Sequence, residues 1–194
     1  GPAVSILGAA ALTHLDADFA VVGEGEETFP RLLAAIGGAA RYEDIAGLCC
    51  RVGGTVRCTP PVLLERFGAS GMQAWIDWPA YERAGGTWTV QTKRGCPLTC
   101  TYCAYPAIEG RVCRRRSAEE VVDEIERVMA RIGPRTFEIV DSTFNVPAEH
   151  AEGICREIIR RGLKINLTAM GVNPLGVSGT LFALMRRAGF NSMM

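Results

Sequence analysis

The 194-residue chain is 48% hydrophobic and 22% charged, and its 21 basic and 21 acidic side chains cancel to a net charge of zero. This balance excludes an intrinsically disordered chain and argues against a broad electrostatic surface for nucleic acid or anionic lipid. No apolar run approaches the roughly 20 residues of a membrane span, and no basic region of a signal peptide is present at the N-terminus. We therefore expect a globular protein without a membrane or nucleic-acid partner.

The first predicted unit is a strand, a glycine turn and a helix. Residues 18–23 (DFAVVG) form a short apolar run that predicts a buried strand, and residues 23–30 (GEGEETFP) lead into a helix that Gly37 and Gly38 end. This order is typical of an open α/β sheet. One strand and one helix cannot bury two faces of a sheet, so we expect the domain to be incomplete at this end.

A β-hairpin follows. Two short alternating runs flank the Gly-Gly pair at 53–54, which is the usual sequence pattern of a tight hairpin turn. Cys49, Cys50 and Cys58 lie in its strands, and we expect free thiols there, because the chain is neither small nor secretory. Residues 60–87 show little periodicity and are interpreted as an irregular linker.

Strands and helices alternate regularly from residue 88 onward. The predicted strands are 88–93, 136–141 and 164–169; the predicted helices begin at Ser117 with a capping box to Glu120, and then cover 147–161 and 178–188. Three such units in register predict a parallel sheet, which a strand from Phe190 would extend. The chain ends within this unfinished sheet, so we expect it to be truncated at both ends.

The clearest chemical signal is a C-x3-C-x2-C loop after the strand at 88–93. Cys96, Cys100 and Cys103 could supply three thiolates to an iron–sulfur cube and leave a fourth iron open. The loop leaves the carboxyl end of a strand, where barrels of this type build their active sites. A zinc site with Cys113 as the fourth ligand is an alternative, although zinc sites usually pair their cysteines at two separated places.

The cysteine loop and its surroundings resemble the radical S-adenosylmethionine (radical SAM) superfamily, with Tyr102 just before the last cysteine of the motif. Three further segments resemble the branch that carries an N-terminal cobalamin-binding domain: residues 94–97 (RGCP), 114–117 (RRRS) and 141–145 (DSTFN). Residues 22–29 (VGEGEETF) are similar to the last strand–helix junction of that domain.

The resemblance implies an α/β chain built from pieces of two domains. Residues 1–40 would be the C-terminal end of a Rossmann-like cobalamin-binding domain, and residues 41–87 a hairpin and linker. Residues 88–194 would be the first (βα)3 units of a partial TIM-type radical SAM barrel.

The resemblance also implies the roles of the site residues. Cys96, Cys100 and Cys103 would ligate a [4Fe-4S] cluster, whose open iron chelates SAM. Reduction would then cleave SAM to methionine and a 5′-deoxyadenosyl radical that abstracts hydrogen from the substrate. The implied SAM-binding residues are Tyr102 at the adenine, and Asp141 and Ser142 near the methionine ammonium. Asp141 could equally fill the barrel interior.

Cobalamin is the third cofactor that the resemblance implies. Gly23, Glu24 and Gly25 would line the approach of its nucleotide tail, and the activity would be methyl transfer to a small molecule or natural product. An electron donor such as flavodoxin or ferredoxin and a cytoplasmic location complete this interpretation. The alternatives are a radical SAM cyclase, an RNA methylthiotransferase-like enzyme, and a zinc-stabilised binding module.

Two departures from the family pattern affect the cofactor sites. The motif that supplies a histidine to cobalt in some relatives is absent, and His14 and His150 are interpreted as structural. Asn173 stands where many relatives carry an arginine, which leaves that part of the SAM pocket undefined.

Overall fold

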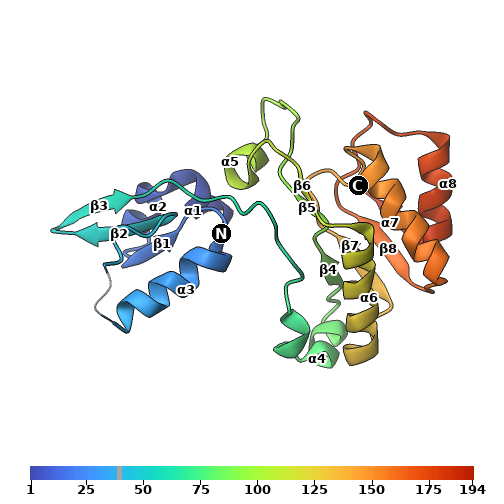
Figure 1. Ribbon diagram of the computed structural model, residues 1–194, viewed down its shortest axis with the longest axis horizontal. Coiled ribbons are helices and arrows are strands. Elements are labelled where there is room, and N and C mark those ends of the chain that lie inside the picture. Colours follow the sequence, from blue (N-terminus) through green and yellow to red (C-terminus); the bar gives the residue numbers. More distant parts are fainter. Residues whose placement is uncertain (39–40) are drawn as a thin grey trace. The chain divides into compact units, whose positions relative to one another are not determined.

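A computed structural model describes residues 1–38 and 41–194 of the protein (Figure 1). It divides into two compact units, which are described separately: Gly1–Glu65 with Gly95–Val112, and Arg66–Arg94 with Cys113–Met194. The predicted domain boundary at 40/41 adjoins residues 39–40, which lie outside the described residues, and the predicted domains stay a prediction. Within the described ranges, no helix is both long enough and apolar enough to cross a membrane.

The first unit contains a three-stranded antiparallel sheet between two layers of helix (Figure 1). Its strands, in the order β1-β2-β3, are β1 (Phe19–Val21), β2 (Leu48–Val52) and β3 (Thr55–Cys58). Its main helices are α1 (Pro2–Leu7), α2 (Ala9–His14) and α3 (Gly25–Ile36). Leu12 of α2 packs on Ala20 at one face, and Leu32 of α3 packs on Leu48 at the other. The predicted hairpin is confirmed, and it extends the sheet of β1.

The expectation of free thiols in the hairpin is wrong for two of its three cysteines, because Cys49 and Cys58 form a disulfide. The tight turn at 53–54 sets the register in which these residues lie directly opposite each other. The Thr59 N–H donates to the Leu48 carbonyl at 3.0 Å, so the next pair along is a non-hydrogen-bonded one, in which side chains approach most closely. Hairpin register, rather than chain length or compartment, brings these two sulfur atoms together.

The second unit confirms the predicted parallel sheet. Its strands, in the order β4-β7-β8-β9, are β4 (Trp88–Val90), β7 (Thr136–Ile139), β8 (Asn166–Ala169) and β9 (Phe190–Met193). The helices between them are α6 (Ala118–Ile132), α7 (Ala148–Arg161) and α8 (Gly179–Ala188) (Figure 1). Ser117 and Glu120 form the predicted capping box, and Gly162 and Gly189 end their helices in the left-handed conformation.

The two faces of this sheet differ in character. The buried side chains that pack with the helices are Trp88, Val90, Phe137, Ile139, Leu167 and Ala169. Between them, Thr89, Glu138 and Thr168 alternate onto the other face, and the strand register places them side by side. The helices therefore bury an apolar face, and the opposite face carries a polar row.

The segment at 60–87 is more ordered than predicted. It contains a 3-10 turn, η1 (Met72–Ala74), and a short helix, α4 (Trp78–Arg83), whose first turn is capped by the Asp77 carboxylate. Trp78 packs edge-on against Trp88, with ring centroids 5.4 Å apart. Short helices without a repeating apolar stripe are stabilised by such caps and tertiary contacts. Hydrophobic periodicity in the sequence does not reveal either of these.

The ends of β7 and β8 approach so closely at Gly171 that a larger residue there would destabilise the fold. A Cβ at this position would lie 2.7 Å from the Ser142 carbonyl oxygen and 2.9 Å from that of Asp141, and both are backbone atoms that cannot rotate away. We expect Gly171→Ala to lower the free energy of unfolding by about 1–3 kcal/mol, measured by urea denaturation of the 194-residue chain.

Gly153→Ala is the matched control. Its Cβ would meet only Ala118, at an ordinary 3.9 Å, within helix α7. This variant should be more stable than the parent by about 0.5–1 kcal/mol, because alanine is the better helix former. Equal effects of the two substitutions would contradict the close approach at Gly171.

Candidate functional site

The three motif cysteines lie in one loop of the first unit, and all are free thiols. Cys96 is buried, Cys103 is half-buried and Cys100 is exposed. The Cys103 N–H donates to the Cys100 carbonyl at 3.2 Å, which makes a tight turn at the loop tip. Among the described residues, no three His, Cys, Asp or Glu side chains converge closely enough to hold a metal ion. The donor chemistry thus fits an iron–sulfur cluster, whereas the thiols do not yet meet at one point.

A two-residue ladder in the second unit joins the chain ends of this loop. β5 (Lys93–Arg94) pairs antiparallel with β6 (Arg114–Arg115). The guanidinium of Arg94 also lies 4.3 Å from the centre of the Phe67 ring, a cation–π contact. The loop therefore leaves and re-enters this unit at neighbouring points.

Asp141, which was predicted near SAM, is 2% exposed and is engaged by the end of β4. Its Oδ1 accepts the Thr92 N–H at 2.7 Å and the Lys93 N–H at 3.2 Å, and its Oδ2 accepts the Thr92 hydroxyl. Burial raises the pKa of Asp141 above its ordinary range, against the opposing effect of these hydrogen bonds. These contacts assign Asp141 the task of joining strand ends, and its binding of SAM stays a prediction.

Ser142, the next residue, is in the opposite situation. Its hydroxyl oxygen is buried, and within the described part of the chain no group hydrogen-bonds to it. A buried hydroxyl without a partner is costly unless a ligand or water satisfies it. Ser142 is thus the better candidate of the two for contact with a bound molecule.

A buried polar network surrounds the end of β4. His150 of α7 shares a hydrogen bond with the Thr92 hydroxyl, at 2.9 Å from Nε2. Lys93 is fully buried, and its Nζ donates to the Thr143 hydroxyl at 3.1 Å. Burial, together with the charges of Lys93 and Arg115, lowers the pKa of His150 from 6.5 to about 4, so the imidazole is neutral at pH 7. The structural role expected of His150 agrees with this contact.

Asn145 ends the segment 141–145 that carries part of the family resemblance, but the sequence assigned it no role. It is fully buried, and its Nδ2 donates to the carbonyls of Asn173 (2.7 Å) and Leu175 (3.2 Å). Its Oδ1 accepts the Asn173 N–H at 2.7 Å. This amide joins the loops that follow β7 and β8, and it holds the backbone of Asn173.

The residues predicted to approach cobalamin make contacts within the first unit. Gly23 has φ of +82°, and a Cβ there would lie 3.0 Å from Pro61 Cβ. The backbone conformation and this neighbour therefore favour glycine at position 23 without any ligand. Glu24 Oε2 accepts the Leu64 N–H at 2.8 Å. Gly25 starts α3 and would tolerate a Cβ, at 3.8 Å from Val21. The role of all three toward cobalamin stays a prediction.

Tyr102, predicted at the adenine, is 90% exposed in the cysteine loop. Its role toward SAM stays a prediction as well. Cys113, the fourth ligand in the zinc alternative, is half-buried, and no described group of three metal-binding side chains includes it.

Comparison with known proteins yields one family and several relatives. A model described as the radical SAM superfamily matches residues 90–194. An uncharacterised methyltransferase of Pyrococcus horikoshii is 31% identical over 156 residues, which cover 78% of this chain and 34% of the relative. A tryptophan 2-C-methyltransferase of Streptomyces laurentii is 37% identical over 92 residues, which cover 47% of this chain and 15% of the relative.

Among solved structures, the chain is similar to TsrM of Kitasatospora setae, a radical S-adenosylmethionine methyltransferase solved with tryptophan and a SAM analogue. The TM-score is 0.83 at 26% identity, over 100% of this chain and 40% of TsrM. The same methyltransferase has also been solved with cobalamin and a [4Fe-4S] cluster bound. The chain thus spans well under half the length of these relatives.

The shifted pKa of His150 predicts a pH-dependent stability. The unfolded imidazole takes up a proton near pH 6.5 and the folded one only near pH 4, so the unfolded state binds more protons between these values. The contribution of neutral His150 is therefore complete above pH 6.5 and is lost progressively as the pH falls to 4. The loss should reach at most about 3 kcal/mol.

His150→Gln supplies the comparison. The difference in unfolding free energy between parent and variant, measured by urea denaturation from pH 7.5 to pH 4, isolates His150 from Asp141, whose raised pKa acts in the opposite direction. A difference that does not change with pH would show that His150 titrates normally in the folded protein.

Proposed function

The chain belongs to the radical SAM superfamily, and on that basis we propose that Cys96, Cys100 and Cys103 hold a [4Fe-4S] cluster at which the protein cleaves SAM. The observation that carries this proposal is three free thiols in one loop, joined to the end of the first strand of a parallel βα sheet. The loop exposes Cys100 and Tyr102, so cluster and SAM can be reached from solvent during loading. When bound, the cluster supplies the electron that splits SAM into methionine and a 5′-deoxyadenosyl radical.

The protein's own residues would then orient SAM. The unpartnered hydroxyl of Ser142 supports it as an acceptor for the methionine ammonium, with Asp141 beside it holding the strand ends. Asn145 contributes by fixing the backbone at Asn173. We assign Tyr102 to the adenine, since it presents an exposed ring next to the last cysteine.

We further propose that the reaction is cobalamin-dependent methyl transfer to a small molecule or natural-product intermediate. This rests on the likeness to methyltransferases and on the cobalamin seen in TsrM. Residues 1–40 would then be the C-terminal end of a Rossmann-like cobalamin-binding domain, with Gly23, Glu24 and Gly25 near the cofactor.

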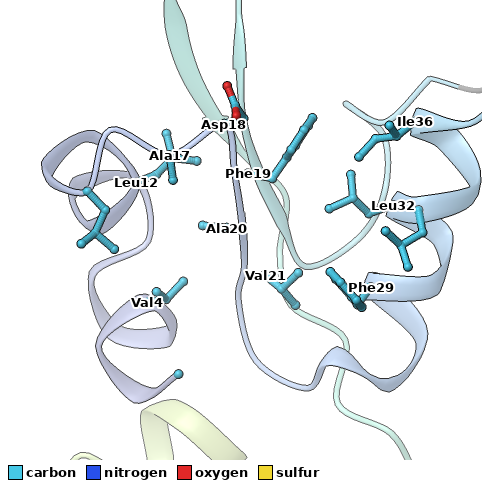
Figure 2. A pocket seen from close by; sticks show the side chains of 13 residues that line it. Val4, Leu12, Ala17, Asp18, Phe19, Ala20, Val21, Phe29, Leu32 and Ile36 are labelled. Atoms are coloured by element: carbon cyan, nitrogen blue, oxygen red, sulfur yellow. The ribbon is translucent and has the colours of Figure 1, made fainter.

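The open edge of β1 supports the idea of a larger sheet in this domain. The Val22 N–H donates to the Gly47 carbonyl at 2.8 Å, so by strand alternation the backbone groups of Phe19 and Val21 point away from β2. A cavity of about 620 Å³ runs along this edge between α1–α2 and α3 (Figure 2). Its apolar walls include Val4, Leu12, Phe29, Leu32 and Ile36. A further strand of the same polypeptide would pair with β1 and fill this cavity.

An electron donor such as flavodoxin or ferredoxin and a cytoplasmic location belong to the same proposal, because the cluster must be reduced before it can act. The Cys49–Cys58 disulfide opposes this placement, since a reducing compartment disfavours disulfides.

Substitution of the motif cysteines tests the cluster. We expect Cys96→Ala, Cys100→Ala and Cys103→Ala each to abolish assembly of a [4Fe-4S] cluster on anaerobic reconstitution with iron and sulfide. The measurements are iron and sulfide per chain and the visible absorbance of the cluster. The reason is that each thiolate ligates a different iron of the cube.

Cys155→Ala and Cys113→Ala are the controls. Cys155 is fully buried in α7, where burial raises the pKa of its thiol to about 12, so its loss should leave assembly intact. A colourless parent protein with stoichiometric zinc would instead support the zinc-stabilised module. In that case Cys113→Ala should lose the bound zinc.

The reaction is tested with the protein at its full encoded length. After reconstitution and reduction, addition of SAM should yield 5′-deoxyadenosine, and the purified protein should retain cobalamin. Formation of 5′-deoxyadenosine without cobalamin retention would reject the cobalamin-dependent reaction and favour another radical SAM chemistry. Absence of cluster, cobalamin and SAM cleavage together would reject the enzyme altogether.

A further inference from the structure

Hydrogen bonds between described residues close the cysteine loop at its base. The Gly95 N–H donates to Oε2 of Glu109 at 3.1 Å, and the Cys96 N–H donates to the Gly110 carbonyl at 3.1 Å. Glu109 is the last residue of the short helix α5 (Tyr105–Glu109), on the returning side of the loop. Outgoing and returning chains therefore meet directly beside the first cysteine of the motif.

Gly95 shows how tightly the two chains meet. It has φ of +86°, and a Cβ at this position would lie 2.2 Å from the Val112 carbonyl oxygen. Glycine is required here both by the backbone conformation and by the returning chain. The carboxylate of Glu109 supplies the acceptor for the Gly95 N–H at this crossing.

The base of the loop matters most for Cys96. This cysteine is 5% exposed, and its own N–H donates to the Gly110 carbonyl, whereas Cys103 donates to the Cys100 carbonyl within the loop itself. Among the described residues the three thiols do not converge, so the loop must rearrange when a cluster forms. Cys96 is thus the ligand whose position is set before the cluster is bound.

We propose that Glu109 is a positioning residue for the iron–sulfur cluster: its carboxylate holds the backbone of Gly95 and thereby fixes Cys96 where the cluster needs its first thiolate. The interaction is a charge-assisted hydrogen bond, roughly twice as strong as a neutral one. This inference rests on the proposed function, because it assumes that the motif cysteines bind a cluster.

Two substitutions of similar size separate the hydrogen bond from simple packing. Glu109→Gln keeps an acceptor oxygen at the same reach, whereas Glu109→Met keeps the length and removes that acceptor. Glu65→Gln, at an exposed position of the same unit, is the control for loss of a negative charge. All are made in the protein at its full encoded length and compared by far-ultraviolet circular dichroism and thermal unfolding before iron and sulfide are added.

We expect Glu109→Met to assemble the cluster roughly tenfold more slowly than the parent, because the Gly95 N–H loses its charged acceptor. Glu109→Gln should recover most of the rate, and Glu65→Gln should match the parent. The rate is followed anaerobically by cluster absorbance, with iron and sulfide per chain measured at the end. Unfolding of the iron-free proteins should be alike.

Three results would overturn the proposal. Assembly in Glu109→Met at the rate of the parent would show that the hydrogen bond does not position Cys96. Equal defects in Glu109→Met and Glu109→Gln would assign the effect to charge instead of to the acceptor. An iron-free Glu109→Met that is unfolded would make Glu109 a general stability residue. Failure of the parent itself to assemble a cluster would contradict the proposed function, a result that the variants are not needed to detect.

Discussion

One buried carboxylate organises the edge of the parallel sheet on which the proposed chemistry depends. Beyond the end of β4, the N–H groups of Thr92 and Lys93 no longer pair with β7 and are buried, where unpaired donors are costly. Asp141, at the end of β7, accepts both of them and the Thr92 hydroxyl as well. His150 holds that hydroxyl from α7, so strand ends and helix share one polar centre.

This arrangement gives neighbouring residues different roles: Asp141 stabilises the fold, whereas Ser142 is available to bind a ligand. Asp141 is occupied by β4, while the hydroxyl of Ser142 is left without a partner among the described residues. Asn145 has a comparable structural role toward β8. Its side-chain amide hydrogen-bonds to both the N–H and the carbonyl of Asn173. Hydrogen bonds thereby connect the ends of β4, β7 and β8, the kind of support that a precisely positioned site needs.

In the first unit, the sheet ends at β1 in a strand edge that is unpaired among the described residues. β1 lies at the end of the sheet order, and helices on both sides present apolar side chains to the cavity beside it. An open strand edge with apolar walls favours pairing with another strand. The disulfide across β2 and β3 joins the hairpin strands and leaves that edge unchanged.

The sequence by itself determined the parallel sheet, the helices of the second unit and the cysteine motif. Each depends on local signals: apolar periodicity, the capping box at Ser117, helix-ending glycines and cysteine spacing. The turn at 53–54 sets the hairpin register that pairs Cys49 with Cys58, although a chain that is neither small nor secretory argued for free thiols. Only the tertiary structure decided that Asp141 accepts from the end of β4, that Ser142 has no partner among the described residues and that Glu109 accepts the Gly95 N–H. The reason is physical: a polar side chain takes its role from the donors that folding brings to it, and those donors lie tens of residues away or across a loop.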